Sequence, residues 1–176
     1  MIPRVIAISA FALISSGALF AQDVANYSGT WKSDPSRSES AHWATSVGPI
    51  TLIISQTPTS ISIETRTSPK DKELIANERL VFKLDGSENT MPGNAQVPVL
   101  CKARWEDGNL VTETARNLNG STLTTHWVLA LDPAGKELTL KKTLMVQHGY
   151  QWNASMVNTS GNATDIFVKV RAEGKK

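Results

Sequence analysis

The stretch Ser28-Gly29-Thr30-Trp31 opens the part of the chain in which short alternating segments are separated by turns. Glycine lets the backbone bend tightly because it has no Cβ atom. A tryptophan two residues later offers a large apolar surface that can close one end of a small β-barrel. We therefore predict that Gly29, Thr30 and Trp31 form a structural motif in which Trp31 plugs that end.

A period of two in residue character predicts strands along most of the chain. In residues 60–67, for example, Ile61 and Ile63 fall on one face and polar residues fall on the other. This half-polar alternation is typical of antiparallel sheets with one buried face, and no segment has the sustained i, i+3, i+4 spacing of a long amphipathic helix. The predicted strands lie around residue 31 and within 50–55, 60–67, 79–84, 101–106, 109–111, 123–131, 138–140 and 165–171.

Turn signals between these segments indicate how the strands are connected. In Trp105-Glu106-Asp107-Gly108-Asn109-Leu110-Val111, Asp107 and Gly108 provide the positive φ angles of a tight hairpin turn. Asp132-Pro133-Ala134-Gly135 predicts a second turn. The sequence thus predicts an all-β fold of about eight to ten antiparallel strands. An up-and-down β-barrel is favoured over a two-sheet sandwich, the alternative, because closure removes exposed edges.

Two long segments interrupt the alternation. Residues 33–49 are rich in serine and predict a short helix or a lid over one end of the barrel. Residues 147–164 predict a short strand around Trp152 followed by a polar loop. Loops of this length are often functional.

The first 21 residues have the three parts of a secretory signal peptide. Arg4 is followed by an apolar run, and Ala21 precedes a plausible cleavage point. The apolar run has about 16 residues, fewer than the ~20 that a membrane span needs. Cleavage leaves residues 22–176, enough for a single β-barrel domain without a membrane span. We expect an exported, periplasmic or extracellular, bacterial protein.

Charge and cysteine content exclude several kinds of function. The chain has 18 basic and 16 acidic residues, and removal of residues 1–21 leaves 17 and 16. This balance gives no electrostatic basis for binding nucleic acid or an anionic membrane. Cys101 is the single cysteine of the sequence, so an intrachain disulfide is impossible. His42 and His148 lack the spacing of metal ligands, and we expect no metal or cofactor.

The motif Gly29-Thr30-Trp31-Lys32 resembles the opening motif of the calycin superfamily, which comprises lipocalins, fatty-acid-binding proteins and avidins. The longer run from Ser28 to Ser38, with the hairpin at 105–111, resembles a group of secreted bacterial proteins of unknown function. Both resemblances imply a lipocalin-like barrel. The sequence lacks the Thr-Asp-Tyr signature of lipocalins and the Arg-x-Tyr arrangement with which fatty-acid-binding proteins hold a carboxylate, so neither resemblance names a ligand.

The lipocalin resemblance also implies a partner for Trp31. In that family an arginine of the last strand stacks as a cation over the tryptophan ring. Arg171 is the candidate by position. It alternates out of phase with Ile166, Val168 and Val170, so the stacking requires a bulge that shifts the register.

Apolar faces of the predicted strands supply the candidates for a ligand cavity, which are Phe82, Trp105, Trp127, Leu129 and Lys142. Ordinary core packing is the alternative for Trp105 and Trp127. Lys142 shares its parity with Leu138 and Leu140. It therefore either points inward, where a buried charge needs an anionic partner, or lies at a bulge or at the barrel mouth.

Three classes of function remain. The favoured one is a non-catalytic barrel that binds a small, mainly apolar molecule. The alternative is a structural or interaction module with a packed barrel whose loops contact a protein partner. A hydrolase or isomerase needs polar groups that converge in a pocket. The sequence contains no Gly-x-Ser-x-Gly nucleophile motif, and we assign no catalytic residue.

Overall fold

The computed structural model describes residues 25–42, 49–67, 77–148 and 159–170. The predicted signal peptide and Trp152 lie outside these ranges. Within them, no helix has the length and apolar character that crossing a membrane requires.

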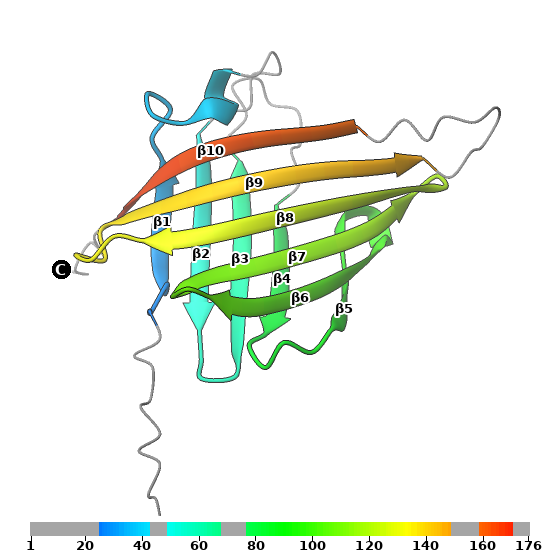
Figure 1. The fold of residues 1–176 in the computed structure, drawn as a ribbon, viewed down its shortest axis with the longest axis horizontal. Coiled ribbons are helices and arrows are strands. Elements are labelled where there is room, and N and C mark those ends of the chain that lie inside the picture. The colour runs from blue at the N-terminus through cyan, green and yellow to red at the C-terminus, as the bar shows by residue number, and fades with distance from the viewer. Residues whose placement is uncertain (1–24, 43–48, 68–76, 149–158, 171–176) are drawn as a thin grey trace, which may run out of the picture.

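Strands dominate the described chain (Figure 1). Their bounds are β1 (Gly29–Ser33), β2 (Ile50–Gln56), β3 (Ser60–Thr67), β4 (Glu78–Lys83), β5 (Asn89–Pro92), β6 (Pro98–Glu106), β7 (Asn109–Leu118), β8 (Ser121–Leu131), β9 (Glu137–His148) and β10 (Thr159–Lys169). Two 3₁₀ helices, η1 (Glu39–His42) and η2 (Asn94–Gln96), accompany them.

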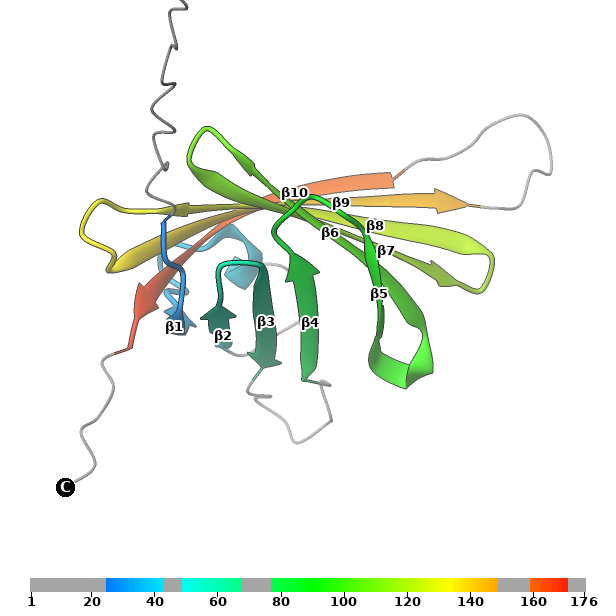
Figure 2. The same ribbon diagram turned by 90° about the horizontal axis from the view of Figure 1, so that it is seen from below.

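All ten strands belong to one sheet in the order β4-β3-β2-β1-β10-β9-β8-β7-β6-β5. Each ladder is antiparallel, and β1 pairs with β10, so the sheet curls into a nearly closed barrel. Figures 1 and 2 show the long strands β6 to β10 crossing over β1 to β4. The predicted all-β, up-and-down barrel is confirmed.

Side chains rather than a backbone ladder connect β4 and β5, the two ends of the sheet; we call this junction the seam. Asn89 Nδ2 on β5 donates a hydrogen bond of 3.0 Å to the Val81 carbonyl on β4. Glu78 at the start of β4 accepts a hydrogen bond of 3.3 Å from the Asn94 amide of η2. Gly93 allows this approach, because a Cβ atom there would lie 3.3 Å from Glu78 Oε1 and 2.5 Å from a Val99 methyl group.

The turns that the sequence predicts are present. Asp107 and Gly108 have φ angles of 49° and 80°, as the tight turn between β6 and β7 requires. In the turn between β8 and β9, the Gly135 amide donates to the Asp132 carbonyl over 2.9 Å. The Asp132 carboxylate accepts from the Lys136 and Glu137 amides.

The prediction of a loop at 147–164 is wrong at both ends. Strand β9 continues to His148, and β10 begins at Thr159. Thr159 pairs with Val146 and Thr164 with Lys141, so the long β9 strand provides a ladder partner for this polar segment. The backbone of a polar segment forms the same ladder hydrogen bonds as that of an apolar segment. The polar character of residues 159–164 therefore did not show that they form a strand.

The helix predicted within 33–49 is present as η1, and the segment that contains it is anchored to β10. Ser38 Oγ accepts a hydrogen bond of 3.0 Å from the Ile166 amide. The Ser40 amide donates to Asp165 Oδ1 over 3.1 Å, and Glu39 accepts one of 2.6 Å from the Thr164 amide. Residues 43–48 lie outside the described residues.

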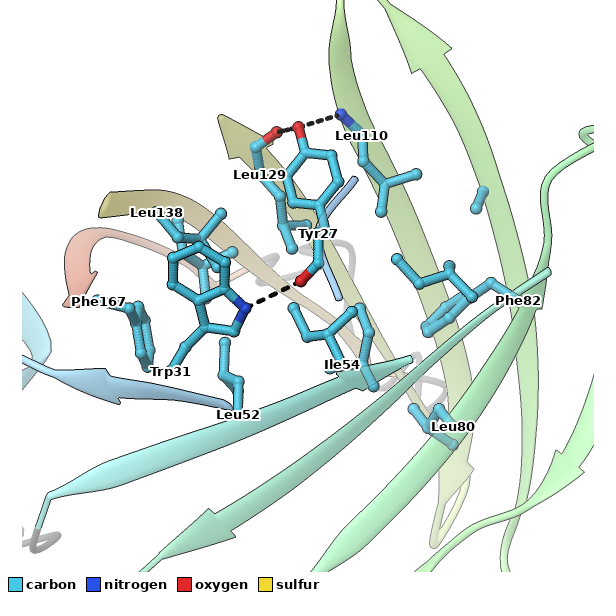
Figure 3. Packing of buried hydrophobic residues seen from close by; sticks show 14 of the residues in the cluster. Tyr27, Trp31, Leu52, Ile54, Leu80, Phe82, Leu110, Leu129, Leu138 and Phe167 are labelled. Carbon is cyan, nitrogen blue, oxygen red and sulfur yellow. Dashed lines mark hydrogen bonds between the residues drawn. The ribbon is translucent and has the colours of Figure 1, made fainter. Parts of the chain in front are cut away.

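A packed core fills the end of the barrel near β1 (Figure 3). Trp31 is fully buried, and its Nε1 donates to the Tyr27 carbonyl over 2.9 Å. The Tyr27 hydroxyl donates to the Leu129 carbonyl over 2.8 Å and accepts a longer hydrogen bond from the Leu110 amide. Tyr27, which no sequence pattern singled out, thus joins the N-terminal segment to β7 and β8.

A lysine provides the cation over Trp31. Lys169 Nζ lies 5.0 Å from the centre of the Trp31 ring, whereas Arg171 lies outside the described residues. Gly29 makes room for this lysine, because a Cβ atom there would lie 2.6 Å from Lys169 Cε. The φ angle of Gly29, +148°, is also one that other residues rarely adopt.

The inward face of β10 differs from the expected one. Ala163, Asp165 and Phe167 are buried, whereas Val168 is 43% exposed. The expectation that Ile166, Val168 and Val170 face inward is therefore wrong. Lys169 has the parity of the buried residues, so it reaches Trp31 without a bulge.

We predict that Tyr27→Phe lowers the free energy of unfolding by about 1–3 kcal/mol, because it leaves the buried Leu129 carbonyl without its donor. Tyr27→Ala also removes the ring from the core and should cost about 3–5 kcal/mol. Urea denaturation of both variants measures the two values. Equal stability of Tyr27→Phe and the wild-type protein would show that the hydroxyl does not hold the barrel end.

Candidate functional site

A cavity of about 180 Å³ lies inside the barrel, further along the strands than the packed end. On β7 and β8 the packed end is built from Leu110 and Leu129, and the next inward positions, such as Thr112 and Trp127, belong to the cavity wall. The described residues of the wall are Ile63, Thr65, Glu78, Leu80, Phe82, Thr112, Thr114, Arg116, Thr125 and Trp127.

Threonines replace aliphatic residues at the inward positions around the cavity. Thr112 opposes Trp127, and Thr114 opposes Thr125, in the ladder between β7 and β8. The shorter threonine side chains leave the space that leucines fill at the packed end. The indole Nε1 of Trp127 is buried, and no described residue accepts a hydrogen bond from it. Apart from Glu78 and Arg116, the described cavity wall therefore combines apolar side chains with uncharged polar groups.

One ion pair forms part of this wall. Arg116 Nη1 and Nη2 on β7 donate to the two carboxylate oxygens of Glu78 on β4, each over 2.9 Å. The pair therefore also links the two sides of the seam. The hydrogen bonds from Arg116 are the main reason why the pKa of Glu78 lies below its ordinary value, so Glu78 is ionised at neutral pH.

A second ion pair lies next to the cavity wall. Lys142 opposes Trp127 in the ladder between β8 and β9, and its Nζ binds the carboxylate of Asp165 and Ser40 Oγ. Burial raises the pKa of Asp165, which is 1% exposed, but the hydrogen bonds from Lys142 and Ser40 outweigh burial and lower it overall. Ser40 thus joins η1 to the barrel interior.

The structure separates the residues that the sequence nominated as ligand contacts. Phe82 and Trp127 line the cavity. Leu129 is fully buried in the packed core, and Trp105 packs against it with its ring 6.0 Å from that of Tyr27. Lys142 is directed to Asp165 and Ser40. Contact of these residues with a ligand stays a prediction.

Sequence reasoning missed the two charged residues of the wall. Glu78 has the parity of Leu80 and Phe82 but precedes the strand predicted at 79–84. Arg116 has the parity of Leu110 and Thr112 in a strand whose end was not predicted. Extending each alternating run would have placed both side chains inside the barrel. No pattern of neighbouring residues indicates that they pair with each other, because they lie 38 residues apart in the sequence.

In the parts of the chain that the structure describes, no three His, Cys, Asp or Glu side chains form a group that could hold a metal ion.

Comparison with known proteins identifies the class of fold. No family model and no curated protein matches the sequence. Solved structures of calycin-type barrels do match, so the chain has a calycin-like β-barrel fold.

Three of these structures illustrate the likeness. Lipid binding protein 8 of Caenorhabditis elegans is 15% identical, with a TM-score of 0.52, over 82% of this chain and 95% of that one. A secretory abundant heat soluble protein of Ramazzottius varieornatus is 18% identical, with a TM-score of 0.53 and the same coverage. The Schistosoma mansoni fatty acid binding protein in complex with arachidonic acid is 15% identical, with a TM-score of 0.50, over 84% and 98%.

We predict that Asp165→Asn destabilises the protein by about 3 kcal/mol at pH 7, because it removes the buried carboxylate that Lys142 binds. The folded-state pKa of Asp165 is lowered, so its stabilising effect is present above the ordinary pKa of 3.8 and is lost as the pH falls below it. The stability gap between wild type and variant should therefore narrow from pH 7 to pH 3.

Urea denaturation at both pH values measures this gap. Asp107→Asn, in an exposed turn, is the matched control and should have little effect at either pH. A gap for Asp165→Asn that is the same at pH 7 and pH 3 would contradict the assigned pair.

Proposed function

We propose that the protein binds a small, mainly apolar molecule in the barrel cavity and does not change it chemically. The observation that carries this proposal is the cavity itself, whose wall combines the apolar side chains of Ile63, Leu80, Phe82 and Trp127 with four threonines and one internally neutralised ion pair. Ligand sites in proteins are typically enclosed, mainly apolar and furnished with a few placed polar groups.

Cavity size restricts the ligand. Its volume of about 180 Å³ slightly exceeds the ~150 Å³ of an engineered cavity that binds benzene. It lies below the roughly 300–1,000 Å³ of pockets for drug-sized molecules. A compact ligand, such as a short-chain or monocyclic molecule, fits best. Lipid and fatty acid binding in the names of two similar structures supports the apolar class of ligand.

The ionisable groups at the cavity favour binding over catalysis. Glu78 and Arg116 neutralise each other through two hydrogen bonds, so neither is poised to transfer a proton. Cys101 opposes Thr114 in the neighbouring ladder and is fully buried. Burial raises the pKa of its thiol to about 11, so the nucleophilic thiolate is scarce at neutral pH.

A packed interaction module is the second candidate, and the filled end of the barrel favours it. Tyr27, Trp31, Leu129 and Leu138 are fully buried there. In this alternative the cavity is a packing defect, and the loops contact a partner. Binding of a small apolar probe distinguishes the two candidates.

We predict that 1-hexanol binds saturably and shifts the indole N–H resonance of Trp127 in the NMR spectrum of the ¹⁵N-labelled protein, because Trp127 lines the cavity. Trp127→Phe assigns this resonance. Leu80→Trp places a larger side chain in the wall and should weaken hexanol binding by about tenfold or more, that is by ~1.4 kcal/mol.

Val168→Trp is the matched control, because Val168 lies outside the cavity wall and is 43% exposed. It should leave hexanol binding unchanged. Hexanol that shifts no resonance of a wall residue, or that binds equally well to both variants, would favour the packed module instead.

We further propose that the protein acts after export from a bacterial cell, supported by the signal-peptide pattern of residues 1–21. Protein isolated from the periplasm or medium of its host should begin at Gln22, as measured by mass spectrometry of the intact chain. A mature form that retains Arg4 and the apolar run would contradict export with cleavage.

A further inference from the structure

The charged residues in the described cavity wall, Glu78 and Arg116, are bound to each other. Two parallel hydrogen bonds of 2.9 Å use both oxygens of the carboxylate. The two side chains are only 20% and 18% exposed, so water competes little for them. In this bidentate arrangement the opposite charges cancel at the cavity.

The positive charge of Lys142, which points inward next to the wall, is also neutralised by an acidic side chain. Lys142 opposes Trp127 across the β8–β9 ladder, and its ammonium group binds Asp165 and Ser40. Asp165 is 1% exposed, so this carboxylate stays beside the lysine rather than in solvent. Arg116 and Lys142 therefore each already have an acidic partner within the protein.

The remaining polar groups of the wall are uncharged. Four are threonine hydroxyl groups, and the fifth is the indole N–H of Trp127. An indole N–H only donates hydrogen bonds, and no described residue accepts from this buried one. Because an unsatisfied buried donor is unfavourable, a ligand atom that accepts a hydrogen bond gains by binding beside it.

These groups discriminate between ligands by charge. A carboxylate that enters the cavity loses its hydration, finds Arg116 already neutralised and is repelled by the ionised Glu78. An alcohol, aldehyde or ketone of the same size also carries an oxygen that accepts a hydrogen bond, but it pays neither penalty. The apolar remainder of both molecules contacts the same wall.

We propose that the cavity selects an uncharged apolar molecule with one hydrogen-bond acceptor, such as an alcohol, aldehyde or ketone, and that Glu78 sets this selectivity by holding Arg116. This inference rests on the proposed ligand-binding function. Glu78 determines specificity through Arg116, and the Trp127 N–H is the donor to the ligand oxygen.

Titration of the wild-type protein with 1-hexanol and with hexanoate at pH 7 provides the first test. The two probes have equal chain length, and hexanoate is ionised at this pH. The Trp127 indole resonance reports the dissociation constant of each probe. We expect hexanol to bind at least about tenfold more tightly than hexanoate.

Glu78→Gln provides the second test. The variant removes the negative charge and leaves Arg116 as an unneutralised cation in the wall, so the affinity for hexanoate relative to hexanol should rise by about tenfold or more. Glu106→Gln is the matched control, because Glu106 pairs with Arg104 on the exposed surface, where its side chain is 50% exposed. It should leave the ratio of the two affinities unchanged.

The outcomes separate the two proposals. If neither probe shifts the Trp127 resonance, the proposed ligand-binding function fails. If hexanoate binds the wild-type protein as tightly as hexanol, or if folded Glu78→Gln keeps the wild-type ratio, the selectivity inference fails while ligand binding stands. If the NMR spectrum of Glu78→Gln shows that the variant is unfolded, the test rests on the wild-type protein. Equal affinities of the wild-type protein for hexanol and hexanoate would then overturn the inference.

Discussion

The hydrogen bonds of Tyr27 connect parts of the barrel that no single ladder joins. Its carbonyl holds the Trp31 ring of β1, and its hydroxyl group bridges the backbones of β7 and β8. Burial raises the pKa of this hydroxyl group, so it remains a donor over the physiological range. The hydroxyl group thus ties the N-terminal segment beside β1 to β7 and β8, across the barrel interior. This end of the barrel is filled by the packed core, and the cavity lies further along the same strands.

Packing and charge divide the interior into two regions. Large apolar side chains fill the end near Trp31, whereas threonines and one ion pair surround the cavity. The core stabilises the fold by removing apolar surface from water. The ion pair contributes less to stability than a packed apolar pair would, because its charges must leave water. Its place in the wall agrees with the ligand selectivity that we propose.

The sequence predicted those features that depend on neighbouring residues. Asp107 and Gly108 define their turn locally, and alternation predicts the strands and the barrel. The inward face of β10 was mispredicted because Asp165 lies inside, which makes the apolar residues around it look like the core face. Its burial depends on Lys142 and on η1, both distant in the chain. The wall pair of Glu78 and Arg116 was missed for the same reason, since a long-range partner makes an inward charge tolerable.

The seam gives the barrel a preferred place to open. Strands β4 and β5 each have one ladder neighbour, and side chains such as Asn89 and Glu78 span the junction between them. Side-chain contacts break and re-form faster than a cooperative backbone ladder. Fluctuations that admit molecules to the interior should thus concentrate at one line along the wall. The Glu78–Arg116 pair crosses that same line, so the group that balances the charge of the cavity also holds the two sides of the seam together.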